Sequence, residues 1–330
     1  MIALSLLAAV IPASVLAWAI WWADRYEREP FHLLVAAFAW GAIPAIMFSL
    51  IFELILGTPF SEDLLSGLLV QTAMIAPIAE ELFKGMALLG LMFCSRAEID
   101  DVLDGMVYGA LVGVGFAMTE NFLYFLNANT GGDLILLVLL RSFVFGLNHI
   151  LFTSIFGAAV GFAAQKRNKG VQIIVMTIGI LLAIGAHTFH NFSMVLSNQF
   201  WPLLVMSFLL SWGGAFIMFV IVLSSLQRER HIIQRYLDSL PQISTQDKKR
   251  LLSLVPYWSR WFPFLPGRDE NRRLTAQLDQ TIAEAAFHWQ RMQNCRGKEC
   301  EALREKIADL QERQEKIQSL RHKLAASASH

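Results

Sequence analysis

The chain has 330 residues, of which 55% are hydrophobic and only 16% are charged, against about 25% charged in typical soluble proteins. With a mean hydropathy of +0.48, this composition excludes a disordered protein, disfavours a water-soluble domain and indicates an integral membrane protein. The net charge is zero, but residues up to Leu226 contain 8 Lys/Arg and 14 Asp/Glu, whereas the remainder contains 19 and 13. The sequence therefore predicts a membrane domain at 1–226 and a basic tail at 227–330.

Apolar stretches of spanning length fill the first part of the chain. A spanning helix needs about 20 mostly apolar residues. The first such stretch lacks the basic start of a signal peptide and ends at a pair of tryptophans, so we interpret it as a retained span. We predict an all-α, polytopic bundle of about seven spanning helices, followed by a helical tail. The seven stretches are 1–22, 31–56, 64–94, 105–127, 134–162, 171–196 and 202–226.

Lysine and arginine in the short loops predict the orientation. They occur in the loops 23–30, 95–104 and 163–170 and at the start of the tail, and these segments all fall on one side. Cytoplasmic loops carry an excess of Lys and Arg. We therefore expect a multi-pass protein of a bacterial inner or plasma membrane, with the N-terminus outside and the tail in the cytoplasm. Cys295 and Cys300 are then expected to be free thiols, because the cytoplasm is reducing.

The basic tail has its own pattern. Apolar residues at a spacing of three to four predict helices at 270–294 and 298–324, arranged as a hairpin or a short coiled coil. The aromatic, proline-broken segment 251–267 suits a membrane interface or packing under the domain. The basic excess favours contact with lipid headgroups or a cytoplasmic partner, and we expect no binding of nucleic acid.

Ionisable side chains lie inside the third apolar stretch, where they are costly and usually mark a site, an ion path or a structural pair. Glu80 and Glu81 are adjacent, and Lys84 follows one helical turn later. Two neighbouring carboxylates in a low dielectric cannot both ionise cheaply. One can pair with Lys84 while the other acts on water as a general base. A structural Glu–Lys pair, or the proton-carrying carboxylate of a transporter, fits the same residues.

Polar groups recur in the next three stretches. Glu120 and Asn121 follow a row of glycines in the fourth stretch, and glycines let helices approach closely. In the sixth stretch His187 and Asn191 are four residues apart and share a helix face. At a rise of 1.5 Å per residue, the polar groups of the four helices fall within a layer of roughly 12 Å. We therefore predict one polar pocket at or just outside the midplane, to which the fifth stretch contributes Arg141 and His149.

Taken in chain order, these residues resemble the motifs of the PrsW family of intramembrane proteases. The resemblance covers about residues 20–225 and leaves out the tail. The family is similar to the CAAX prenyl proteases, but here Lys84 follows the glutamates after two residues, where those relatives have Arg after three. The matching motifs are Glu80-Glu81-x-x-Lys84, Asp104-Gly105 to Gly115-Phe116-x-x-x-Glu120-Asn121, Arg141-Ser142 with His149, and His187-x-x-x-Asn191-Phe192.

The resemblance implies hydrolysis of a peptide bond within the membrane. The implied substrates are single-span membrane proteins such as anti-sigma factors, cut near the outer face. From the residue chemistry we expect Glu80 or Glu81 to deprotonate water with the help of His149. His187 and Asn191 would donate hydrogen bonds to the oxyanion. The supporting residues are then Lys84, Glu120, Asn121 and Arg141.

Two alternatives stay open at this point. Glu81, His149 and His187 have the side chains to bind zinc with one open position. The chain has no His-Glu-x-x-His motif, so a glutamate-type mechanism without a cofactor is favoured and zinc is the alternative. A proton-coupled transporter would also use buried Glu, Lys and His, although no inverted repeat is visible. A non-catalytic scaffold would leave the buried groups unexplained.

Overall fold

The computed structural model describes most of the chain as helix. The described residues are 1–23, 29–57, 65–95, 98–240, 243, 248–249, 251–252, 270–293, 295 and 298–327. Arg25, Arg28 and Arg96, on which part of the orientation prediction depends, lie outside them, as does nearly all of the aromatic segment 251–267. Within the described residues every regular element is a helix, which confirms the predicted all-α class.

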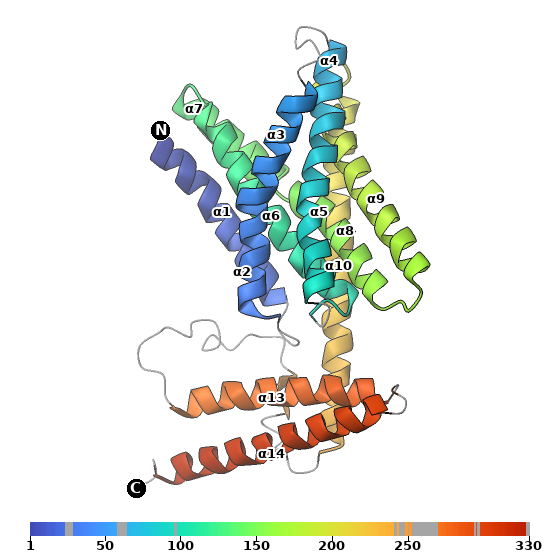
Figure 1. The fold of residues 1–330 in the computed structure, drawn as a ribbon. Helices are drawn as coiled ribbons and strands as arrows, with labels where there is room; N and C mark the ends of the chain where they lie inside the picture. Colours follow the sequence, from blue (N-terminus) through green and yellow to red (C-terminus); the bar gives the residue numbers. More distant parts are fainter. Residues whose placement is uncertain are drawn as a thin grey trace. The chain divides into compact units, whose positions relative to one another are not determined.

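The chain forms α-helices interrupted by three wider π-helical turns, labelled η (Figure 1). By its internal contacts it divides into two compact units, Met1–Val222 and Leu223–His330. The elements of the first unit are α1 (Ile2–Ala23), α2 (Phe31–Trp40), η1 (Gly41–Ala45), α3 (Ile46–Gly57), α4 (Leu65–Leu69), η2 (Val70–Ile75), α5 (Ala76–Cys94), α6 (Val102–Leu126), α7 (Gly131–Val138), η3 (Leu139–Val144), α8 (Asn148–Ala164) and α9 (Lys169–Leu196). The boundary falls within α10 (Pro202–Asp238), and the second unit adds α13 (Glu270–Met292) and α14 (Lys298–Ser327).

Six helices among the described residues are long and apolar enough to cross a membrane, so the chain is an integral multi-pass membrane protein. The predicted span at 64–94 is not one of the six. It is nevertheless helical from Leu65 to Cys94, as α4, η2 and α5, and it carries the three charged residues of the Glu80–Lys84 motif. The six are Ile2–Ala23, Phe31–Leu56, Val102–Leu126, Gly131–Ala164, Lys169–Leu196 and Pro202–Asp238.

Helix α6 is the centre of the first unit (Figure 1). Within the protein, 83% of the apolar span of α6 is buried, against 39% or less of each of the other five spans. Glycines bring α6 against α8 at backbone distance. A Cβ atom at Gly105 would collide with the carbonyl oxygen of Gly157, and one at Gly113 would collide with the carbonyl oxygen of His149. This close contact sets the position of His149 relative to the polar end of α6.

The three π turns lie on helices that carry or surround the polar residues. Pro44 lies within η1, and Pro77 follows η2 in the first turn of α5, so each proline removes a helical N–H donor. The carbonyl of Ala42 in η1 accepts a hydrogen bond from Thr119 of α6 at 2.7 Å. The carbonyl of Thr72 in η2 accepts one from Asn191 of α9 at 2.9 Å. π turns are frequent at functional sites, and here their carbonyls tie separate helices together.

The second unit is built around an apolar seam between α13 and α14, which run side by side in opposite directions (Figure 1). Leu278 and Ile282 on α13 and Ile307 and Leu310 on α14 are buried. The predicted helices are therefore present, with ends close to those expected. The predicted leucine pattern weakens along α14, where Leu320 is exposed; the side chain of Leu324 lies outside the described residues.

The expectation of free thiols in the tail is wrong in the structure. Cys295 and Cys300 form a disulfide, whereas Cys94 is a free, exposed thiol. Cys295 follows the end of α13 and Cys300 lies in the first turn of α14. The connection brings their Cα atoms to 5.4 Å, within the range that a disulfide spans.

Candidate active site

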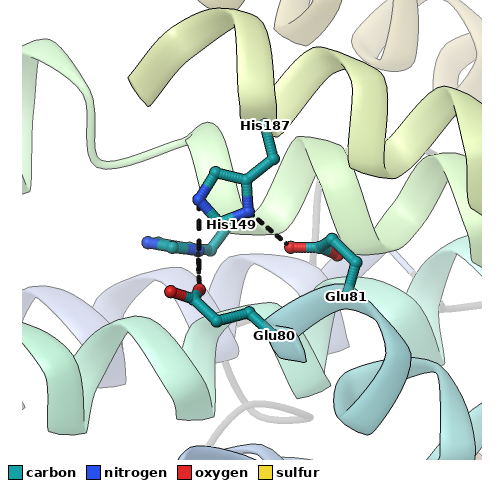
Figure 2. A group of neighbouring side chains, drawn as sticks. All are labelled: Glu80, Glu81, His149 and His187. Atoms are coloured by element: carbon teal, nitrogen blue, oxygen red, sulfur yellow. Dashed lines mark hydrogen bonds and ion pairs between the residues drawn. The ribbon is translucent and has the colours of Figure 1, made fainter. Parts of the chain in front are cut away.

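The polar residues of three helices meet inside the first unit. Helix α5 contributes Glu80 and Glu81, α8 contributes His149, and α9 contributes His187 (Figure 2). Taking one oxygen or ring nitrogen from each, these atoms all lie within 4.8 Å of one another. We call these four residues the Glu–His cluster. The structure thus brings together these four residues, which the sequence placed in one polar pocket.

Glu81 is the deeper of the two carboxylates and is held by three donors. Lys84 Nζ donates to its Oε1 at 2.8 Å, and Nδ1 of His187 lies 3.0 Å from the same oxygen. Thr153 Oγ1 donates to Oε2 at 3.2 Å. Glu81 is only 1% exposed. A buried carboxylate with this many donors is fixed in place.

Glu80 is held less tightly and faces open space. Lys84 Nζ donates to its Oε2 at 3.1 Å. The same oxygen lies 3.9 Å from Nδ1 of His149 and 3.9 Å from Nε2 of His187 (Figure 2). Glu80 lines a cavity of about 520 Å³, whereas Glu81 is not among the residues of its wall. The two adjacent glutamates therefore have different surroundings.

Lys84 is the counter-ion of both carboxylates and is completely buried. Besides its two bonds to Glu80 and Glu81, its Nζ lies 3.0 Å from Nδ1 of His149. The ammonium also lies 3.8 Å from the centre of the Phe116 ring. Its three protons are thus directed at three members of the Glu–His cluster, so the ammonium holds a position that a metal ion bound by the cluster would require.

His149 is oriented by Glu120, one of the predicted supporting residues. Nε2 of His149 lies 2.7 Å from Oε2 of Glu120. A carboxylate only accepts hydrogen bonds, so this contact assigns the ring proton to Nε2 and leaves Nδ1 bare toward Lys84 and Glu80. Arg141 Nη2 donates to the same oxygen of Glu120 at 2.6 Å and its Nε donates to Asn121 Oδ1 at 2.8 Å. Glu120, Asn121 and Arg141 therefore act together on the orientation of His149.

The predicted residues of α9 divide between the cluster and the cavity wall. His187 packs flat against Phe152, with ring centres 4.8 Å apart, and its Nδ1 proton points to Glu81. Its Nε2 is then bare, like Nδ1 of His149. His190 instead bonds Ser207 Oγ at 2.6 Å, and Asn191 donates its amide to Thr72. In the structure His187, rather than His190, contacts the carboxylates.

The cavity wall contains polar residues that the sequence analysis missed. Glu53 on α3 and Asn148 at the start of α8 both line the cavity, beside the predicted Glu120, Asn121, Arg141 and Asn191. Glu53 has a sequence signal, since it is the one Asp, Glu, Lys or Arg within the stretch 31–56. Asn148 is uncharged and has no such signal. A volume of about 520 Å³ falls in the range of binding sites for small ligands or short peptide segments.

The Glu–His cluster has the donor chemistry of a catalytic metal site. Two imidazoles and a carboxylate are a ligand set of catalytic zinc. Each histidine gives its proton to a carboxylate, His149 to Glu120 and His187 to Glu81, and leaves a bare nitrogen facing the cluster. Metal-binding histidines are usually oriented in this way. The residues therefore fit a metal ion, provided that Lys84 moves out of the cluster.

These features define the chain as a helical membrane protein with a hydrolytic type of site inside its bundle. The family model described as PrsW family intramembrane metalloprotease matches residues 29–226, more than half of the chain. The chain therefore belongs to this family, and it is a membrane-embedded peptidase. The family resemblance inferred from the motifs is confirmed.

Individual relatives agree with this assignment. A protein named Protease PrsW from Bacillus subtilis is 26% identical over 195 residues, which is 58% of this chain and 83% of the relative. One from Geobacillus kaustophilus is 34% identical over 152 residues, 44% of this chain and 61% of the relative. One from Oceanobacillus iheyensis is 28% identical over 210 residues, 63% of this chain and 92% of the relative. No solved structure matches the chain.

Proposed function

We propose that this protein is an endopeptidase that cuts single-span membrane proteins of the anti-sigma-factor type within the bilayer, with Glu80 as the base that takes the proton from water. The observation that carries the proposal is the difference between the two glutamates. Glu80 lines the 520 Å³ cavity with one strong donor, whereas Glu81 is held by three. A base needs lone pairs open to water, and Glu80 has them.

The neighbouring residues prepare this step. Lys84 neutralises part of the charge of the two glutamates, and Glu120 with Arg141 keeps the ring of His149 turned toward Glu80. Glu81 holds His187 by its Nδ1 proton. Because the neutral ring of His187 uses its one N–H for Glu81, it has no N–H left to donate to an oxyanion. Asn191 is the better donor: its amide, which now donates to the carbonyl of Thr72, would donate to the oxyanion of the substrate instead.

We propose zinc as the cofactor, since the family is one of metalloproteases and the donors are imidazole nitrogen and carboxylate oxygen. The bare nitrogens of His149 and His187 would hold the ion. Glu81 would be the third ligand if its Oε1 released the Nδ1 proton of His187, and Glu80 would then stay free to face the cavity. A bound zinc ion activates water and polarises the scissile carbonyl. In the same arrangement Lys84 leaves the cluster, because its ammonium and a cation compete for the same lone pairs.

The test uses purified protein in detergent or nanodiscs and a single-span peptide with fluorescent ends. We expect cleavage, loss of cleavage after treatment with a strong chelator, recovery with added Zn²⁺, and close to one zinc per chain by elemental analysis. Cleavage that survives in metal-free protein would overturn the zinc part and leave the glutamate mechanism. No cleavage of any single-span peptide by metal-loaded protein would overturn the function itself.

The orientation is part of the same proposal, with the N-terminus outside, the tail in the cytoplasm and cleavage near the outer face. The basic loop 163–170 and the basic start of the tail support it. The Cys295–Cys300 disulfide is more typical of an oxidising compartment, so the tail has to be located directly. The test is to place single cysteines in the loop 128–133 or in the tail and to label them in intact cells with a reagent that does not cross the membrane. Labelling of both from one side would reject this orientation.

A further inference from the structure

Asn148 is a buried amide whose side chain is unused within the described part of the chain. It is the first residue of α8, next to His149, and is 2% exposed. Neither its Oδ1 nor its Nδ2 has a hydrogen-bond partner there. A buried polar group without a partner is costly, and such groups are rare in folded proteins. Asn148 also lies in the wall of the 520 Å³ cavity.

The other asparagines of the cavity wall are engaged. Asn121 Oδ1 accepts a bond from Arg141, and the amide of Asn127 donates to the carbonyl of Leu123 at 3.2 Å. The amide of Asn191 donates to the carbonyl of Thr72. Asn148 therefore differs from three residues of its own type in the same wall, since both of its polar atoms lack a partner in the described part of the chain although they are buried.

A peptide main chain is the ligand that this amide matches. A carboxamide offers one acceptor and one donor group, and a peptide unit offers the complementary pair. A helical substrate must lose its internal hydrogen bonds where it is cut, and inside a bilayer no water replaces them. The protein has to supply the missing partners at that point. The N-terminal end of α8, which attracts negative charge, adds to the attraction for a carbonyl oxygen.

We infer that Asn148 is a substrate-binding residue, whose Nδ2 donates to a main-chain carbonyl and whose Oδ1 accepts from a main-chain N–H of the unwound substrate next to the Glu–His cluster. The inference rests on the proposed function and adds to it a residue that pairs with the main chain. Because main-chain groups are common to all sequences, this contact binds the extended conformation rather than a particular side chain.

The first experiment measures binding without cleavage. The Glu80→Gln protein is placed in nanodiscs, and its affinity for a fluorescent single-span peptide is compared with that of the double variant carrying Asn148→Leu. We expect Kd to rise about tenfold, the effect of losing one or two hydrogen bonds. We expect the melting temperature to stay the same or rise, because leucine has a similar size and leaves no unpaired amide. Asn148→Ala repeats the measurement if the leucine variant folds poorly.

Ser142 provides the matched control. Its Oγ is also buried without a partner in the described part of the chain, but Ser142 does not line the 520 Å³ cavity. Ser142→Ala should leave Kd unchanged. An equal Kd for the proteins with and without the Asn148 substitution would overturn the inference. A large fall in melting temperature in both the Leu and the Ala variant would also overturn it, since this would show that the amide has a partner within the protein. If the Glu80→Gln protein binds no single-span peptide and the unsubstituted protein cleaves none, the proposed function itself is overturned.

A second experiment locates the paired peptide group. A series of peptides carries one ester in place of one amide, which removes a single N–H and weakens one carbonyl. At the paired position the ester should weaken binding to the protein that retains Asn148, and should have little further effect when Asn148→Leu is present. Additive effects of the ester and the substitution at every position would overturn the inference.

Discussion

Two ion-pair arrangements, one in each unit of the molecule, differ strongly in burial. In the first unit Lys84, Glu80 and Glu81 form ion pairs whose side chains are at most 8% exposed. In the second unit Asp309 and Arg313 form a pair at 2.9 Å in which both side chains are more than half exposed. A buried pair has a large desolvation cost and is strongly destabilised when one partner is removed, whereas an exposed pair contributes little. The comparison predicts where substitutions have large effects.

The largest effect is expected from the two glutamates, and it separates their roles. Glu80→Gln keeps the shape but removes the base, so kcat should fall by about 10²–10⁴-fold, while the melting temperature should fall less than in Glu81→Gln, because Lys84 keeps Glu81 as its partner. Glu81→Gln should also abolish cleavage, and it should lower stability by about 3–5 kcal/mol, because the buried negative charge that pairs with Lys84 is lost and one of the two oxygens that accept from Lys84, His187 and Thr153 becomes an amide donor. Turnover assays and thermal unfolding in detergent measure both. Equal stability losses in the two variants would contradict the different surroundings assigned to them.

The next effect concerns the competition between Lys84 and a metal ion. Lys84→Met leaves two buried carboxylates without a counter-ion, so the metal-free protein should be destabilised by about 3–5 kcal/mol. Added Zn²⁺ should raise its melting temperature by more than it raises that of the unsubstituted protein, because the cation no longer has to displace the ammonium. Lys169→Met, at an exposed lysine on α9, is the control. A smaller rise with Zn²⁺ than in the unsubstituted protein would show that Lys84 does not hold the metal position.

An intermediate effect is expected from Glu120, which acts through His149. Glu120→Leu should lower kcat by about 10–100-fold, the cost of losing a residue that orients a ligand histidine. Glu120→Gln should retain more activity, because its amide oxygen can still accept the Nε2 proton of His149. Glu53→Gln, in the same cavity wall, serves as the control and should have a smaller effect than Glu120→Leu. Equal activities of the Gln and Leu variants of Glu120 would mean that orientation of His149 is not its role.

The contrast between the units also explains what could be predicted from the sequence. Helical class, family and the helices of the tail follow from apolar length, spacing and motifs, and the structure or the comparisons confirm them. Side chains such as Glu80, Glu120 and His187 attract attention because charge or imidazole in an apolar stretch is rare. Their catalytic roles stay predictions, but the structure places them around one cavity.

Other features depend on how helices pack, and this was not readable from the sequence. The difference between Glu80 and Glu81 arises from Thr153 and His187, which lie far along the chain on α8 and α9. The unused amide of Asn148 appears only when its neighbours are known. The third apolar stretch, predicted as a seventh span, is helical from Leu65 to Cys94 but is not among the six helices that are long and apolar enough to cross a membrane. The disulfide contradicts an expectation that was based on the compartment and not on the distance between the cysteines.

The smallest effect on catalysis is expected from removal of the tail. Truncation after Leu240 leaves the whole cavity in place, because its wall consists of residues of the first unit. It also uncovers Ile233, Tyr236 and Leu237, which are buried and belong to the second unit. A companion truncation with Ile233→Gln and Leu237→Gln therefore keeps the shortened protein soluble.

At equal folded concentration in detergent, turnover of one short single-span peptide should stay within about twofold of the full-length value, the change that about 0.5 kcal/mol allows. The preference among larger substrates should change more than the turnover of the short peptide, since the basic tail suits contact with a membrane surface or a partner. Complete loss of turnover in both truncated forms, with normal melting temperatures, would show that the tail supplies part of the active site. The two units would then act together in catalysis, although the ion pairs compared above differ so strongly in burial.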